Sequence, residues 1–218
     1  MTHRPIRIVV LISGSGSNLQ ALIDAQRSGQ LHGAVIAGVI SNRPGVKGLE
    51  RAAAAGIATI TVDHTRFSNR EDFDTELAQL IDSFTPDLVV LAGFMRILTA
   101  AFTRRYLGRM LNIHPSLLPK YQGLHTHQRV LEAGDSEHGV TVHFVTAELD
   151  GGPAVIQATV PIQQDDDATA LAARVQTQEH IIYPMAVGWF AQGRLSMHNN
   201  QALLDGEPLP ICGYQVKA

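Results

Sequence analysis

Asn112 and His114 are the residues whose types and spacing point most directly to chemistry. They end an apolar run from Met110 that predicts a strand, and residues i and i+2 of a strand point to the same face. A carboxamide donor beside an imidazole can polarise a carbonyl group and stabilise the oxyanion that forms when this group is attacked. The spacing therefore predicts a carbonyl-activating pair, and a hydrogen-bonded pair at a strand end is the alternative.

Asp150 begins the sequence Asp-Gly-Gly-Pro between two expected strands. These residue types favour a turn whatever the function. The two glycines also allow the backbone to place the Asp150 carboxylate close to a ligand. A buried carboxylate next to His114 would raise the pKa of the imidazole, but the linear sequence does not establish that Asp150 and His114 meet, and an ordinary turn is the alternative.

A loop of three serines and two glycines runs from Ser13 to Asn18, and it is called the serine–glycine loop below. It joins an apolar strand to a helix, whose N-terminus offers free N–H groups to an anion. The loop predicts binding of a phosphate or phosphoribosyl group. A plain turn and a dinucleotide site are the alternatives, but Leu19 replaces the third glycine of the dinucleotide fingerprint. No acidic ribose ligand follows the second strand, although Arg43 leaves NADP open.

Five of the ten histidines lie between residues 114 and 143, which raises the question of a metal. His125 and His127 form a His-x-His pair, but a zinc site needs a third ligand. The nearest candidates are His138, His143 and Asp150, and none completes a familiar zinc motif. We predict no metal site. The pair is expected in a loop near the site, His138 in a turn, and His143 facing either the site or solvent.

The first 114 residues alternate short apolar runs with amphipathic segments, which predict strands and helices respectively. The expected strands are 6–12, 33–40, 58–62, 87–92 and 110–114. The expected helices follow the serine–glycine loop with Leu19, Leu22 and Ile23 on one face, span 45–55, begin at a capping box of residues 68–71, and run from a Thr99 cap to Tyr106. Strands that are apolar throughout and alternate with helices predict a doubly wound α/β fold, with a mostly parallel sheet covered on both faces.

The second half of the chain follows a different pattern. Residues 139–145 alternate and residues 154–162 form another apolar run, so both predict antiparallel strands added to the sheet. The acidic cluster of residues 165–167 is expected to cap a long helix over residues 167–191, which Pro184 bends or interrupts, and a short polar tail follows it. We predict a single domain of residues 1–218. Its phosphate-binding, Rossmann-like half covers about 6–114, and its second half of about 115–218 supplies the catalytic loop, strands and long helix.

Composition excludes several classes of protein. A net charge of −3 supplies no basic face for a nucleic acid. The longest apolar runs have eight residues, whereas a bilayer requires roughly 20. Cys212 is the one cysteine, which excludes a disulfide framework within the chain. With no secretory signal at the N-terminus, we expect a cytoplasmic protein that contacts neither nucleic acid nor membrane.

Five motifs in this order and spacing carry a resemblance to a known family. They are the serine–glycine loop, Leu-Ala-Gly-Phe-Met-Arg-Ile-Leu at 91–98, Asn-Ile-His-Pro-Ser-Leu-Leu-Pro at 112–119, Leu-Asp-Gly-Gly-Pro at 149–153 and Gln-Thr-Gln-Glu-His at 176–180. The chain resembles the folate-dependent formyl-transfer enzymes. Among them it is similar, from residue 6 to about 214, to the phosphoribosylglycinamide formyltransferases of purine synthesis.

The resemblance implies an activity and its ligands. A formyl group would pass from 10-formyltetrahydrofolate, a cosubstrate, to the primary amine of 5-phosphoribosylglycinamide by direct attack through a tetrahedral intermediate. No tightly bound cofactor would be needed, and the partners would be these small molecules. We expect a monomer or a homodimer.

The resemblance also implies roles for individual residues. The catalytic residues would be Asn112, His114 and Asp150. The phosphoribosylglycinamide site would contain Gly16, Ser17, Asn18, Gln176, Thr177, Gln178 and Glu179. The folate site would contain Arg70, Met95, Arg96, Ile97, Leu98, Asn112, Thr146, Ala147, Glu148, Leu149 and Asp150.

Three other functions compete with this interpretation. Methionyl-tRNA formyltransferase shares the catalytic trio but carries an RNA-binding domain, for which we expect no room in 218 residues. Formyltetrahydrofolate hydrolase uses water as the acceptor and usually carries an N-terminal regulatory domain, which we do not expect here. A phosphate- or dinucleotide-binding module without formyl transfer is the third.

Overall fold

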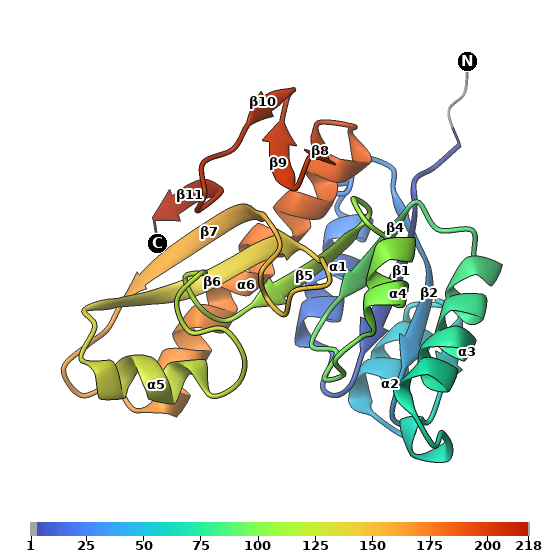
Figure 1. Cartoon of the computed structure of the whole chain (residues 1–218), viewed down its shortest axis with the longest axis horizontal. Helices are drawn as coiled ribbons and strands as arrows, with labels where there is room; N and C mark the ends of the chain where they lie inside the picture. The colour runs from blue at the N-terminus through green and yellow to red at the C-terminus, as the bar shows by residue number, and fades with distance from the viewer. Residues whose placement is uncertain (1–3, 218) are drawn as a thin grey trace. The chain divides into compact units, whose positions relative to one another are not determined.

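The computed structural model describes residues 4–217, which divide into one compact unit up to Leu111 and a second from Asn112. The first unit alternates strands and helices along the chain (Figure 1). Its elements are β1 (Arg7–Ile12), α1 (Ser17–Arg27), β2 (Val35–Ser41), α2 (Lys47–Ala54), β3 (Thr59–Thr61), the 3₁₀ turn η1 (His64–Arg66), α3 (Arg70–Ser83), β4 (Leu88–Leu91) and α4 (Ala100–Arg105).

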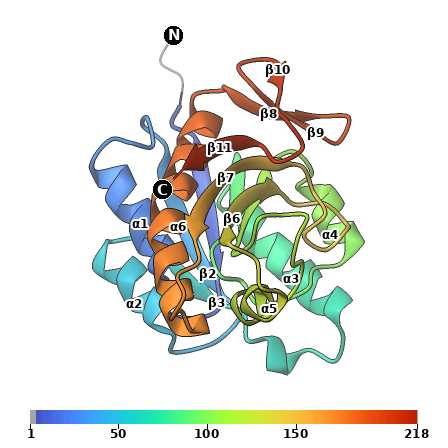
Figure 2. The ribbon, with the colours of Figure 1, turned by 90° about the vertical axis from the view of Figure 1, so that its left-hand side faces the viewer.

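The strands of the first unit run parallel because a helix connects each strand to the next. β1 pairs with β2 on one side and β4 on the other, and β2 pairs with β3. The residues of β1 from Ile8 to Ile12 are fully buried, as expected for a strand covered on both faces. α1 and α2 lie on one face of these strands, and α3 and α4 lie on the other (Figure 2).

The capping prediction for α3 was wrong by one residue. Asn69, not Ser68, is the N-cap, and its side chain accepts a hydrogen bond from the Asp72 backbone N–H at 2.8 Å. Both residue types can satisfy a free N–H at a helix start, so the sequence leaves a choice that local geometry decides. The predicted cap of α4 is confirmed, since the Thr99 side chain accepts from the Phe102 N–H.

The second unit contains a long helix, one pair of long strands and several short strands. Its elements are β5 (Met110–His114), which crosses the boundary, α5 (Thr126–Ala133), β6 (Glu137–Phe144), β7 (Ala154–Pro161), α6 (Ala168–Ala191), β8 (Leu195–His198), β9 (Gln201–Leu204), β10 (Glu207–Pro208) and β11 (Tyr214–Lys217). β6 and β7 are antiparallel and α6 packs against both of them. Asp167 caps α6 by accepting from the Ala170 N–H, and Pro184 lies inside the helix.

Two expectations for the second half were wrong. The polar tail forms β8, β9 and β10, which make a small antiparallel sheet, and β11, which pairs in parallel with β7. Strands this short have weak sequence signals and depend on their partners. Residues 126–133 form a helix where the sequence suggested only a loop.

The strand order establishes the class of the fold. The larger sheet has eight strands in the order β11-β7-β6-β5-β4-β1-β2-β3. It is mostly parallel, with the antiparallel β6–β7 pair in the second half, so the predicted α/β class is confirmed. Among residues 4–217, no helix is both long and apolar enough to cross a membrane.

Candidate active site

β5 carries the Asn-x-His pair that opened the sequence argument. Asn112 is half-buried and His114 is 6% exposed, both at the C-terminal end of the strand. In open α/β sheets, ligands bind outside this end of the strands. The strand therefore presents an amide and an imidazole where a ligand is expected.

His114 is held between two oxygen atoms. Its Nδ1 lies 3.5 Å from Oδ2 of Asp150, and its Nε2 lies 2.9 Å from the backbone carbonyl oxygen of Tyr121. The side chains of His114 and Asp150 are 8% and 9% exposed. A protonated imidazole would donate to both oxygens, because a carbonyl and a carboxylate both accept.

The turn between β6 and β7 brings Asp150 to His114. Asp150 has a φ of +50°, a left-handed conformation that aspartate tolerates better than most residues. Its Oδ2 also accepts the backbone N–H of Gly123 at 3.0 Å. A Cβ atom on Gly152 would lie 1.8 Å from the Phe144 carbonyl oxygen, so only glycine fits there. The Asp-Gly-Gly sequence thus aims the carboxylate as well as making a turn.

His143, which the sequence left facing either the site or solvent, lies beside Asn112 and Asp150. It is 2% exposed on β6, and its Nε2 lies 3.1 Å from Nδ2 of Asn112 and 3.8 Å from Oδ1 of Asp150. Its Nδ1 lies 2.9 Å from the Phe144 carbonyl oxygen. Burial lowers the pKa of His143 to about 4, so the ring is neutral at neutral pH. The alternation of residues 139–145 placed His143 opposite the apolar stripe and was the available signal.

A buried polar network supports the segment after His114. The hydroxyl of Thr141 donates to the Ser116 carbonyl at 2.7 Å and accepts from the Leu118 N–H at 3.1 Å. The side-chain amide of Gln157 donates to the Leu118 carbonyl at 2.7 Å. Because these groups are buried and paired, they fix the path of the chain that leads to the Tyr121 carbonyl.

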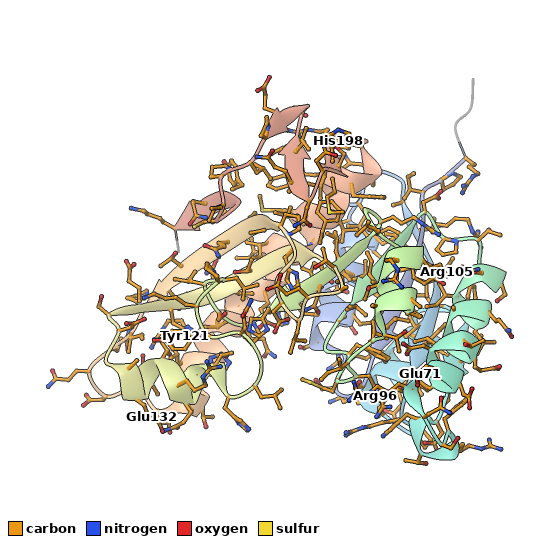
Figure 3. All side chains as sticks on the ribbon, viewed as in Figure 1. Glu71, Arg96, Arg105, Tyr121, Glu132 and His198 are labelled. Atoms are coloured by element: carbon orange, nitrogen blue, oxygen red, sulfur yellow. The ribbon has the colours of Figure 1, made fainter. Side chains whose placement is uncertain are left out.

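Two more histidines form a pair of their own. His127 lies on α5 and His138 on β6, with Nδ1 of the first 3.1 Å from Nε2 of the second, so the predicted turn position of His138 was wrong. Burial lowers the pKa of His138 to about 4. Figure 3 shows Tyr121 beside α5, the helix that carries both His127 and the labelled Glu132. Among residues 4–217, no group of three or more His, Cys, Asp or Glu side chains is arranged to hold a metal ion.

The serine–glycine loop belongs to the first unit. Gly16 is the N-cap of α1 with a φ of +70°, and Ser17 and Asn18 begin the helix. The Ser13 hydroxyl donates to Oδ1 of Asn42 at 2.5 Å and accepts the Met95 N–H at 2.7 Å. The loop and the segment that begins at Met95, two sets of predicted ligand contacts, are therefore directly joined.

The predicted folate residues of the first unit lie after β4 and at the start of α3. Met95 and Ile97 are 64% and 53% exposed, which is unusual for side chains of this size. The guanidinium of Arg96 lies 5.3 Å from the Phe73 ring centroid, and Figure 3 shows Arg96 beside α3. Arg70 is exposed at the first residue of α3. The exposed apolar pair is available to a ligand.

The remaining predicted residues lie on α6 and on the β6–β7 turn. Gln176 and Glu179 are three residues apart on α6 and share a helix face; Thr177 and Gln178 lie between them. Thr146, Ala147, Glu148 and Leu149 form the turn that leads to Asp150, with Leu149 53% exposed. The second unit thus brings Asn112, His114, His143 and Asp150 together. Gln176 to Glu179 lie on α6, and Thr146 to Leu149 lie on the turn between β6 and β7.

Known proteins share this sequence and this fold. A family model described as formyl transferase matches residues 6–187. Phosphoribosylglycinamide formyltransferase of Escherichia coli (strain K12) is 60% identical over 96% of this chain and 98% of its own length, and that of Haemophilus influenzae is 51% identical over 95% and 98%. A solved phosphoribosylglycinamide formyltransferase from Coxiella burnetii superimposes with a TM-score of 0.93, at 53% identity, over 97% of this chain and 99% of its own. The chain therefore belongs to the formyl transferase family, in the group formed by the phosphoribosylglycinamide formyltransferases.

Proposed function

We propose that this formyltransferase transfers the formyl group of 10-formyltetrahydrofolate to the primary amine of 5-phosphoribosylglycinamide, a step of purine synthesis. The observation that carries the proposal is the cluster in which His114 lies beside Asp150, while Asn112 contacts His143, which also lies beside Asp150. Such a cluster offers donors for an oxyanion and a carboxylate to receive or pass on a proton. The identity to relatives that bear this activity in their names supports the choice of acceptor.

The proposed reaction is direct attack of the amine nitrogen on the formyl carbon, with both ligands held in line. A C–N bond forms, the carbonyl π electrons move to oxygen, and collapse of this tetrahedral intermediate breaks the bond to N10 of the folate. The amine loses a proton and N10 gains one. The Nδ2 of Asn112 and the imidazolium of His114 donate to the oxyanion. At Nε2 of His114, the oxyanion takes the place of the Tyr121 carbonyl oxygen.

Asp150 has two roles in this proposal. Its carboxylate is the ion-pair partner of protonated His114, at 3.5 Å. Asp150 also lines a cavity of about 590 Å³, together with residues of the 118–122 and 199–211 segments. In our scheme, a water molecule beside Asp150 carries the proton between the two nitrogens.

We assign the substrates to the residues that the family motifs mark. The serine–glycine loop, at Gly16, Ser17 and Asn18, takes the phosphate of the ribonucleotide, and Gln176 to Glu179 are the other residues that we assign to this substrate. The residues that we assign to the folate are Met95 to Leu98 and Arg70 of the first unit, and Asn112 and the turn from Thr146 to Asp150 of the second unit. The folate is a cosubstrate, so no tightly bound group is proposed. A single domain, a monomer or homodimer, a cytoplasmic location and no nucleic-acid partner stay predictions.

A coupled absorbance assay tests the proposed reaction. Formation of tetrahydrofolate is followed with and without phosphoribosylglycinamide, and we expect turnover only when the ribonucleotide is present. Turnover with water as the sole acceptor would favour a hydrolase. Absence of turnover in both mixtures, with folded protein, would favour a binding module.

Calorimetry tests the phosphate role of the serine–glycine loop. We expect phosphoribosylglycinamide to bind at least about tenfold more tightly than its dephosphorylated form, because the positive end of the α1 dipole favours an anion. Salt should weaken binding of the phosphorylated ligand more than binding of the dephosphorylated one, since screening acts on the charge of the phosphate. Equal affinities for the two ligands would remove the phosphate from this loop.

A further inference from the structure

The carbonyl groups of the serine–glycine loop face α2. The backbone N–H of Gly48, in the first turn of α2, donates to the Gly14 carbonyl oxygen at 3.0 Å. Three residues later, the guanidinium Nε of Arg51 donates to the Ser15 carbonyl oxygen at 2.9 Å. One helix thus holds two consecutive carbonyl groups of the loop.

The first contact between loop and helix is made by two glycines. A Cβ atom on Gly16 would lie 2.6 Å from the Cα of Gly48, and a Cβ on Gly48 would lie 2.5 Å from Cδ1 of Ile12. Gly16 also has a φ of +70°, which favours glycine. Because neither position carries a side chain, the two backbones approach closely enough for Arg51 to reach the Ser15 carbonyl.

Holding a carbonyl also directs the next N–H. In a planar trans peptide unit, the C=O of one residue and the N–H of the following residue point in opposite directions. Because Arg51 turns the Ser15 carbonyl toward α2, the N–H of Gly16 points away from α2. Gly16 caps α1, where the helix dipole favours an anion. Arg51 therefore sets the direction of a donor in the loop.

Arg51 is itself anchored from a second side. Its Nη1 donates to Oε1 of Gln20 on α1 at 3.2 Å, and the side chain is partly buried. The guanidinium therefore bridges the loop carbonyl and the helix that the loop begins. A lysine at position 51 would keep the charge but lack this fork, since its ammonium group is a single point.

We propose that Arg51 is a positioning residue for the substrate phosphate, acting by orienting the Ser15–Gly16 peptide rather than by touching the ligand. This inference rests on the proposed phosphate role of the serine–glycine loop. It assigns a function in ligand binding to α2 through Arg51, which lies outside all the motifs that resemble the family.

Arg51→Met tests the inference, because it removes both hydrogen bonds and keeps an unbranched side chain. We expect its affinity for phosphoribosylglycinamide to fall about tenfold, the size of one charge-assisted hydrogen bond. Affinity for the dephosphorylated compound and for a folate analogue should stay within twofold of wild type. In steady-state kinetics, KM for the ribonucleotide should rise with little change in kcat. Calorimetry and the absorbance assay measure these quantities.

Arg27→Met is the matched control. Arg27 lines the same surface groove of about 300 Å³ as Arg51, and among residues 4–217 it makes no hydrogen bond to the loop. Losing this charge should change ribonucleotide affinity less than twofold. If the control also lost about tenfold in affinity, as much as Arg51→Met, the effect would come from the loss of positive charge near the loop. That result would overturn the inference.

Arg51→Lys separates orientation from charge and serves if the methionine variant does not fold. We expect the lysine variant to bind the ribonucleotide nearly as weakly as Arg51→Met. Full recovery by lysine, unchanged affinity in Arg51→Met, or equal losses for the phosphorylated and dephosphorylated ligands would each overturn the inference. If wild type binds both ligands equally, the phosphate role of the loop fails first, which distinguishes the two failures.

Discussion

Turnover of His114→Ala should be lower than wild type by on the order of 10² to 10⁴, the range for loss of a positioned acid. His114 is buried, and its two nitrogens face the Asp150 carboxylate and the Tyr121 carbonyl. The loss should appear in kcat, because the interaction with the oxyanion exists only once charge develops on oxygen.

The measurement is kcat in the absorbance assay at saturating substrates, with circular dichroism to establish folding. His198→Ala is a suitable control, because His198 is an exposed histidine on β8 (Figure 3). We expect wild-type turnover in this control. Unchanged turnover of folded His114→Ala would remove His114 from the chemistry.

Asn112→Ala should lower kcat by on the order of 10² to 10³, the cost of one lost oxyanion donor. The neutral ring of His143 determines which hydrogen of the Asn112 side-chain amide is available to a ligand. The Nδ1–H of His143 donates to the Phe144 carbonyl at 2.9 Å, so its Nε2 carries the lone pair and accepts one hydrogen of Nδ2 of Asn112 at 3.1 Å. The other hydrogen of this Nδ2 group remains for the oxyanion.

Separate values of kcat and KM test this role. Asn112→Asp is the matched variant, because it keeps the size of the side chain and replaces the donor by a carboxylate oxygen. We expect it to lose at least as much turnover as the alanine variant, which a mere packing role of Asn112 would not produce. A raised KM with preserved kcat in Asn112→Ala would contradict contact with the transition state.

Much of the first unit could be predicted because its signals are local. Apolar runs marked β1, β4 and β5, and the spacing of Leu19, Leu22 and Ile23 marked α1. The Thr99 and Asp167 caps could also be predicted, since a side-chain oxygen at a helix start typically accepts a hydrogen bond from a backbone N–H of the first turn. Local patterns sufficed where each element has its own periodicity.

The short strands and α5 could not be predicted in the same way. β8 to β11 have two to four residues each, too few for periodicity to exceed chance, and their pairing partners stabilise them. α5 begins at Thr126 inside a run of histidines and polar residues, and its buried contacts come from Thr126 and Val130. Tertiary packing rather than propensity determines such elements.

For the site, the sequence by itself determined the residue types, their order and the strand face shared by Asn112 and His114. Only the tertiary structure decided that His143 accepts from Asn112, that the Tyr121 carbonyl faces His114, and that the Gly123 N–H holds Asp150. Two of these three contacts use backbone groups. Every residue carries a carbonyl and nearly every residue an N–H, so no residue type marks the ones that the fold brings to a site.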